Sequence, residues 1–157
     1  MLEASVTSIL LLRGINVGGH HKLPMASLRA LLEKLGCTDV RTYIQSGNAV
    51  FEASAAVAAK LPQSLPAAIQ KAHGFAPPVI LRSAAQLKAA LKANPFKAKA
   101  PEDALHIGFL ADKPSAAAIT TLAPTLAPGE AFKVLGAEIH LHFPLGLAKT
   151  KLTNAYI

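Results

Sequence analysis

The sequence predicts an α+β protein made of two halves, each with a mainly antiparallel sheet. Short aliphatic or alternating segments, which are typical of strands, take turns with segments of helical periodicity. A Ser-Gly-Asn turn between two of the strands is typical of an antiparallel hairpin. With 157 residues, of which 52% are hydrophobic and 16% charged, the chain is long and apolar enough to bury a core without a disulfide or a metal.

The first elements follow from simple patterns. Residues 8–13 form a continuous apolar run that predicts a buried strand, and a glycine-rich loop follows over residues 14–22. A helix is expected from Pro24, because leucines recur at helical spacing until Gly36 ends the pattern; these are Leu28, Leu31, Leu32 and Leu35.

The rest of the first half continues with a hairpin and a crossover. Residues 40–45 alternate as a strand, residues 46–48 form the turn, and residues 49–52 are the returning strand. Residues 54–73 are alanine-rich and mostly helical, but Pro62 and Pro66 predict a break or two short helices. Residues 78–82 are then the fourth strand.

The second half repeats most of this order. Ser83 and Gln86 have capping-box spacing, which predicts a helix from there to about Lys92. Beyond a polar connector, the pattern predicts a strand at 104–111, a helix at 114–122, strands at 130–135 and 138–143, and a helix from Lys149.

This order matches the split βαβ pattern of ferredoxin-like folds. We therefore expect a ferredoxin-like half over residues 1–82 and a second, incomplete one over residues 83–157. In such a half we expect the first two strands to run parallel, with the third between the first and the fourth. The loop after strand one and the hairpin after strand two should then emerge at the same sheet edge.

Several residues at that edge are candidates for holding a phosphate or another small anion. The first helix also begins there, and free N–H groups at a helix N-terminus attract anions. The candidate ligand-binding residues are Arg13, Asn16, Gly18, Gly19, Lys22, Gln45 and Asn48. The alternative interpretation is structural: the glycines make tight turns, Asn16 and Asn48 occupy turn positions of positive φ, and Arg13 pairs with an acid.

The net charge of +7 favours anionic partners, although a solubilising coat of lysines is the favoured explanation, because no basic run is longer than two residues. Aromatic residues are only 5% of the chain and there is no Trp, which disfavours stacking of single-stranded nucleic acid. No apolar run approaches the length of a membrane span, and no signal peptide is evident, so a cytoplasmic protein without membrane contact is expected.

Catalytic and metal motifs are weak. The glycine spacing fits neither dinucleotide nor P-loop motifs, and no cofactor is expected. His140 and His142 share a strand face that we expect to be half-exposed, and a zinc site there would need a further ligand. The lone Cys37 is expected to be a buried, inert thiol. The sequence therefore favours a binding protein over an enzyme, with an acylphosphatase-like hydrolase and a non-specific nucleic-acid binder as alternatives.

Two stretches of the sequence resemble motifs of a known protein family. Residues 11–19 read Leu-Leu-Arg-Gly-Ile-Asn-Val-Gly-Gly, and residues 40–48 read Val-Arg-Thr-Tyr-Ile-Gln-Ser-Gly-Asn. With weaker signatures at 22–25, 94–96 and 149–154, they resemble the bacterial family known as domain of unknown function 1697. The resemblance implies a tandem ferredoxin-like α+β fold and supplies no activity or catalytic residue. Members of that family usually continue into a stretch containing Thr-Arg-Asn-Trp, whereas this sequence contains no Trp.

The two faces of the second predicted strand, residues 40–45, are expected to have different surroundings. Arg41, Tyr43 and Gln45 alternate with Val40, Thr42 and Ile44, which we expect to face the core. We expect Tyr43 to be mostly buried between the two halves, and Gln45 to lie at the sheet edge beside Asn16.

Overall fold

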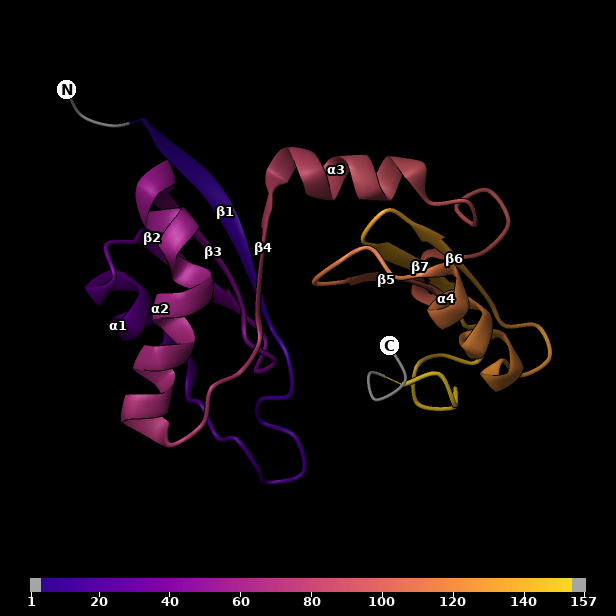
Figure 1. The fold of residues 1–157 in the computed structure, drawn as a ribbon, viewed down its shortest axis with the longest axis horizontal. Coiled ribbons are helices and arrows are strands. Elements are labelled where there is room, and N and C mark those ends of the chain that lie inside the picture. Colours follow the sequence, from indigo (N-terminus) through magenta and orange to yellow (C-terminus); the bar gives the residue numbers. More distant parts are fainter. Residues whose placement is uncertain (1–3, 154–157) are drawn as a thin grey trace. The chain divides into compact units, whose positions relative to one another are not determined.

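The computed structural model describes residues 4–153 and has a mixed α/β fold (Figure 1). The described part contains four α-helices and two antiparallel sheets, one of four strands and one of three. The chain divides into two compact units, Met1–Leu87 and Lys88–Ile157. The boundary between them falls within helix α3 (Ala84–Ala93).

The first unit has the order strand, helix, strand, strand, helix, strand. Its sheet has the strand order β2-β3-β1-β4, and every neighbouring pair is antiparallel. The elements are β1 (Ser5–Leu12), α1 (Met25–Lys34), β2 (Thr38–Tyr43), β3 (Asn48–Ser54), α2 (Ala55–His73) and β4 (Val79–Ser83).

The placement of the third strand was predicted wrongly. It lies between β1 and β2, whereas the sequence analysis put it between the first and fourth strands. The reason is local: a short hairpin connects β2 to β3, so β3 must pair with β2, and β4 takes the remaining side of β1. Because β1 and β2 are both antiparallel to β3, they are parallel to each other as expected, and they end at the same edge.

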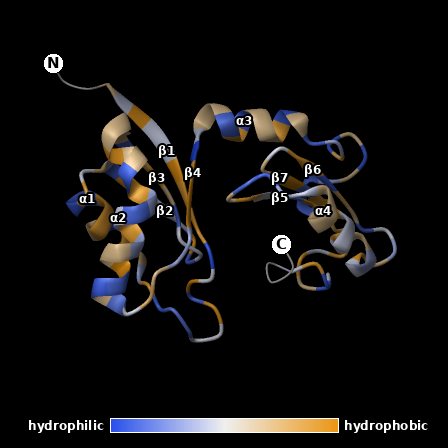
Figure 2. Cartoon of the chain, in the orientation of Figure 1, coloured by the Kyte–Doolittle hydropathy of each residue, from blue (hydrophilic) through white to orange (hydrophobic). Residues whose placement is uncertain are grey.

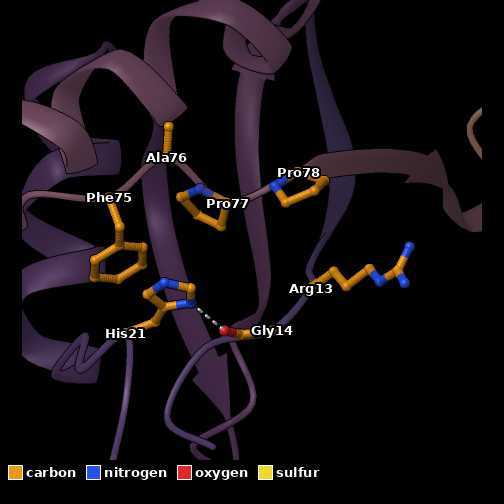
Figure 3. Close-up of a pocket in the computed structure, with 7 residues that line it drawn as sticks. All are labelled: Arg13, Gly14, His21, Phe75, Ala76, Pro77 and Pro78. Atoms are coloured by element: carbon orange, nitrogen blue, oxygen red, sulfur yellow. Dashed lines mark hydrogen bonds between the residues drawn. The ribbon is translucent and has the colours of Figure 1, made fainter. Parts of the chain in front are cut away.

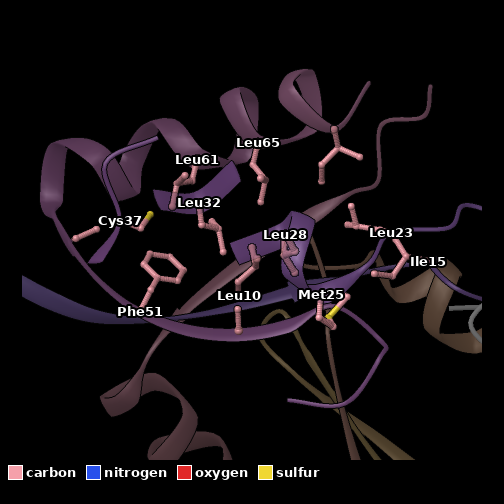
Figure 4. Packing of buried hydrophobic residues seen from close by; sticks show 13 residues of the cluster. Leu10, Ile15, Leu23, Met25, Leu28, Leu32, Cys37, Phe51, Leu61 and Leu65 are labelled. Atoms are coloured by element: carbon pink, nitrogen blue, oxygen red, sulfur yellow. The ribbon is translucent and has the colours of Figure 1, made fainter. Parts of the chain in front are cut away.

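The core of the first unit lies between one face of the sheet and the two helices (Figure 4). Leu10 of β1 and Phe51 of β3 are fully buried against the helix residues Leu28, Leu32, Leu61, Leu65 and Ile69. Figure 2 shows hydrophobic residues along β1 and on both helices. Helix α1 ends as expected, since Gly36 adopts a φ of 98° and the Cys37 N–H donates to the Leu32 carbonyl.

The expected break in the second helix does not occur. Helix α2 is continuous over 19 residues with Pro62 and Pro66 inside it. Each proline costs a helix about 3 kcal/mol or more. Three fully buried side chains, spaced four residues apart at Leu61, Leu65 and Ile69, contribute about 1.5–3 kcal/mol each, while Pro62 is exposed. Packing against the sheet therefore offsets the lost hydrogen bonds.

The predicted capping box at the start of α3 is confirmed. The Ser83 N–H donates to Gln86 Oε1 at 2.8 Å, and the Gln86 N–H donates to Ser83 Oγ at 3.1 Å. Two donors that the helix leaves unsatisfied are thus paired by side chains.

The second unit has a three-stranded antiparallel sheet of order β5-β7-β6. Its core contains Ile139, Leu141, Phe143 and Leu152. The elements are β5 (Leu105–Phe109), α4 (Ala116–Leu122), β6 (Ala131–Leu135) and β7 (Glu138–His142), with short 3₁₀ turns at Glu102–Ala104 and Ala123–Thr125.

The helix expected from Lys149 is not present over residues 149–153, and residues 154–157 lie outside the described part. Side-chain contacts hold this segment in an irregular path. Thr150 Oγ1 donates to Glu130 Oε2 at 3.1 Å and accepts from the Leu152 N–H at 3.1 Å. Leu152 is thereby fixed in the core, where it is 1% exposed.

Tyr43 was expected to be buried and is 70% exposed. Cross-strand pairing puts Thr42 beside the buried Ala49 and Tyr43 beside Asn48, so Tyr43 stands on the face away from the helices. Strand β2 ends at Tyr43, and Ile44 is in the turn, 59% exposed and with a φ of 50° instead of facing the core. Ile44 is a β-branched residue in the left-handed region, which is an uncommon conformation.

Replacing Ile44 by Asn is expected to raise the free energy of unfolding by about 1 kcal/mol, because Asn tolerates positive φ and an exposed Ile loses little burial. Chemical denaturation measures the change. Ile44→Val is the matched control, since Val keeps the β-branch and hence the strain. Equal stability of the Asn variant and the wild type would show that the turn stores no strain.

Candidate functional site

Three loops meet at the end of the first sheet where β1 and β2 finish. We call residues 13–24, 44–47 and 73–78 the loop end. The Leu12 N–H donates to the Gly47 carbonyl at 3.2 Å, and the Arg13 N–H donates to the Pro78 carbonyl at 3.4 Å. The expected meeting of the loop after strand one with the hairpin after strand two is therefore observed.

Asn16 holds the loop end together. Its Nδ2 donates to the Gln45 carbonyl at 2.7 Å and to the Leu23 carbonyl at 2.9 Å, while its Oδ1 accepts from the Leu23 N–H at 2.8 Å. The residue adopts a φ of 53°, as its structural interpretation required. Its amide joins the first loop to both the hairpin and the segment that leads into α1.

Gly47 allows the hairpin to pack against the first loop. It is buried, with a φ of 83°, and an added Cβ would lie 2.6 Å from Ile15 Cδ1 and 2.8 Å from Leu12 Cβ. Real Cβ atoms do not come this close, so only glycine fits here.

The other predicted ligand-binding residues lie near the contacts made by Asn16 and Gly47. Gln45 is exposed and beside Asn16, as expected, through its backbone carbonyl. Asn48 has no positive φ: it begins β3, and its Nδ2 donates to Ser46 Oγ at 2.8 Å. Lys22 is exposed, and Gly18 and Gly19 have φ values of 58° and 79° at the exposed tip of the loop.

A cavity of about 260 Å³ opens at the loop end (Figure 3). Of the predicted ligand-binding residues, Arg13 alone lines it. The full lining is Arg13, Gly14, His21, Phe75, Ala76, Pro77 and Pro78. Sequence reasoning did not single out His21 or Phe75 as lining residues. The one visible signal in the sequence is that Phe75 lies two residues before the pair Pro77-Pro78.

The side of the cavity formed by His21 is fixed by two contacts. His21 Nδ1 lies 3.0 Å from the Gly14 carbonyl oxygen, and the imidazole stacks on Phe75 with ring centroids 4.7 Å apart. The Arg13 side chain leads away from this ring pair in Figure 3.

The described acidic residues of the first unit are confined to one end of its sheet. Between residues 4 and 87, the acids Glu33, Asp39 and Glu52 all lie toward the opposite end of the sheet, where β1 and β2 begin, β3 finishes and α1 ends. The loop end and the last turn of α2 hold basic side chains and no acid; these are Arg13, Lys22, Lys71, His20, His21 and His73. A helix C-terminus carries partial negative charge, which favours Lys71 and His73 where they stand.

The histidine pair of the second unit differs from its prediction. His140 is fully buried, not half-exposed, and neither of its ring nitrogens has a hydrogen-bond partner among the described residues. Its Nε2 lies 3.6 Å from Glu138 Oε2. Burial lowers the pKa of His140, and the Glu138 carboxylate acts in the opposite direction. Burial also lowers the pKa of His106.

His142 is only partly buried. It stacks on Phe96 and lines a second cavity of about 400 Å³ with Asp103. Within residues 4–153, no three or more His, Cys, Asp or Glu side chains are grouped so that they could hold a metal ion. Cys37 is buried, as expected, and burial raises its pKa to about 11, so the thiol stays protonated.

Asn16→Gly is expected to lower the free energy of unfolding by about 2–3 kcal/mol, because it removes three hydrogen bonds while keeping the positive φ accessible. Urea denaturation measures it. Asn48→Ala is the matched control and should cost less than about 1 kcal/mol, since it removes one exposed bond to Ser46. Equal losses in the two variants would contradict the bracing role of Asn16.

The free energy of unfolding is expected to decrease as the pH is lowered, because of His140 and His106. Because burial lowers their pKa values in the folded state, the unfolded chain binds protons first as pH drops below about 6.5. Each histidine contributes a slope of at most about 1.4 kcal/mol per pH unit, down to its pKa in the folded state. Urea midpoints from pH 8 to pH 5 measure this; His140→Leu should flatten the profile, and an unchanged slope would argue against the effect.

The chain was compared with curated proteins, solved structures and protein-family models. No curated protein matches the chain. Among solved structures, the conserved bacterial protein SP0830 from Streptococcus pneumoniae is similar, with 27% sequence identity and a TM-score of 0.71 over 89% of this chain and 77% of that chain. The family model described as "Protein of unknown function (DUF1697)" matches residues 6–140, which include the entire loop end. The chain therefore belongs to the DUF1697 family, whose description names no specific function.

Proposed function

We propose that this protein binds a small anionic ligand, a phosphorylated compound or another oxyanion, at the loop end. One observation carries the proposal: the loop end holds basic side chains and no acid, while the three acids among residues 4–87 all lie toward the opposite end of the sheet. A surface lined by one sign of charge concentrates ligands of the other sign. Arg13 and Lys22, which we propose as the charged ligand-binding residues, are both exposed there.

The bracing of the loops supports binding as well. Asn16 and Gly47 hold the first loop against the hairpin before any ligand arrives, so little ordering is left to oppose binding. A Cβ added at Gly19 would meet no atom within 4 Å, so the space beside its backbone is open. We propose that Gln45 and Asn48 border the site from the hairpin side.

We further propose that both units are ferredoxin-like, the first complete and the second incomplete. The order β5-β7-β6 corresponds to β1-β3-β2 of the first unit, and α4 connects β5 to β6 as α1 connects β1 to β2. Within residues 4–153, the second unit has no strand that corresponds to β4.

A binding protein is favoured over a hydrolase of the acylphosphatase type. In that mechanism Asn48 would position water, but its amide donates to Ser46 in this structure.

Among the described residues no helix is long and apolar enough to cross a membrane. We propose a cytoplasmic location, which the single, buried cysteine supports.

Arg13→Ala and Lys22→Ala are each expected to weaken binding of inorganic phosphate about tenfold, the effect of losing one charge-assisted hydrogen bond. Titration calorimetry at fixed ionic strength measures the dissociation constant. Lys34→Ala is the matched control: it also removes one exposed positive charge, but at the opposite end of α1. Equal weakening in all three variants would indicate general electrostatics without a site, and no phosphate binding by the wild type would overturn the proposal.

A further inference from the structure

The cavity at the loop end is mostly apolar, although its surroundings are basic. Four of its seven lining residues contribute only apolar side chains, namely Phe75, Ala76, Pro77 and Pro78. A bare inorganic anion would use none of this surface. The lining therefore contains information on the ligand that charge alone does not.

The aromatic side of the cavity is formed in advance. The Gly14 carbonyl can only accept a hydrogen bond, so His21 Nδ1 must carry the hydrogen in the contact between them. The stack on Phe75 fixes the plane of the same ring. Two independent contacts thus orient His21, and a ligand ring would meet a surface that needs no rearrangement.

The polar atoms suit an anionic group next to that surface. With its hydrogen on Nδ1, His21 can donate from Nε2 to an anion in its protonated form, while in its neutral form the ring serves as an aromatic surface only. Arg13 lies on the other side of the cavity, with its guanidinium on the side away from the rings (Figure 3). A ligand lying along the prolines can therefore have its apolar part at the rings and its charge toward Arg13.

The size of the cavity limits the ligand. Pockets for drug-sized molecules have volumes of about 300–1,000 Å³. At about 260 Å³ the cavity admits one ring with a small substituent. A nucleoside triphosphate or a dinucleotide would leave most of its atoms outside.

We propose that the ligand is an oxyanion on a single apolar ring, such as an aryl phosphate or an aromatic carboxylate, and that the ring lies against His21 and Phe75. The inference rests on the proposed function, because the loop end supplies the positive charge. It goes further in predicting that the apolar body of the ligand contributes to affinity and selects among anions.

Titration of the full chain with methyl phosphate, phenyl phosphate and benzoate tests the inference. The measured quantity is the ratio of the dissociation constants of methyl phosphate and phenyl phosphate. The wild type is expected to bind phenyl phosphate about tenfold more tightly, the gain expected of a ring contact in a preformed apolar site. The relative affinity of benzoate shows whether the charged group is a carboxylate or a phosphate.

Three variants locate the ring. His21→Ala should bring the ratio close to one, His21→Phe should keep it because the aromatic wall remains, and His20→Ala, at an exposed neighbour outside the lining, should leave it unchanged. Circular dichroism of each variant confirms that it is folded.

The outcomes separate the two proposals. Equal affinity of the wild type for methyl and phenyl phosphate would overturn the ring site and leave the anion site standing. A tenfold preference that survives His21→Ala would likewise place the ring elsewhere and overturn the inference. Absence of binding of all three compounds would overturn the proposed function together with the inference.

Discussion

The loop end depends on one side chain that bonds to two distant parts of the chain. Asn16 contacts Leu23 seven residues away and Gln45 twenty-nine residues away, with both its donor and its acceptor in use. Without these bonds, two backbone carbonyls and one N–H would lose their partners. The same residue that sequence reasoning offered as a ligand group is therefore engaged in positioning the loop, and the proposed anion site relies on Arg13 and Lys22 instead.

The chemistry of the loop end follows from the topology of the sheet. Insertion of β3 between β1 and β2 makes those two strands parallel, so both loops emerge at one edge. Helix α1 begins at that edge and α2 ends there, which determines where each charged residue along the helices is found. The absence of acids from the loop end thus results from positions along elements whose directions are fixed.

Local patterns in the sequence predicted local structure well. The leucine spacing of α1, its glycine stop and the Ser83–Gln86 capping box involve residues within one or two turns of each other, and all three are observed. The failures involve tertiary contacts. Prolines that would break an isolated helix are tolerated in α2 because the sheet packs against it, and Thr150 draws residues 149–153 away from a helix by bonding to Glu130. His140 is buried by contacts that its own strand pattern does not report.

Some features of the candidate site could be predicted from the sequence, and others depend on tertiary contacts. The meeting of residues 13–22 with residues 45–48 could be derived from strand direction, and so could the place of Arg13 and Lys22. The stack between His21 and Phe75 joins residues fifty-four positions apart, and no periodicity encodes such a contact. The apolar lining of the cavity became visible only once the loop before β4 was placed.

The continuous path of α2 has a consequence for how the first unit acquires its structure. Two prolines remove internal hydrogen bonds from the middle of the helix, and short helices are marginal in water even when every bond is present. The segment therefore gains its helical form only together with the contacts of Leu61, Leu65 and Ile69 in the core. We therefore expect the first unit to fold cooperatively, with α2 forming in the same step as the core it covers.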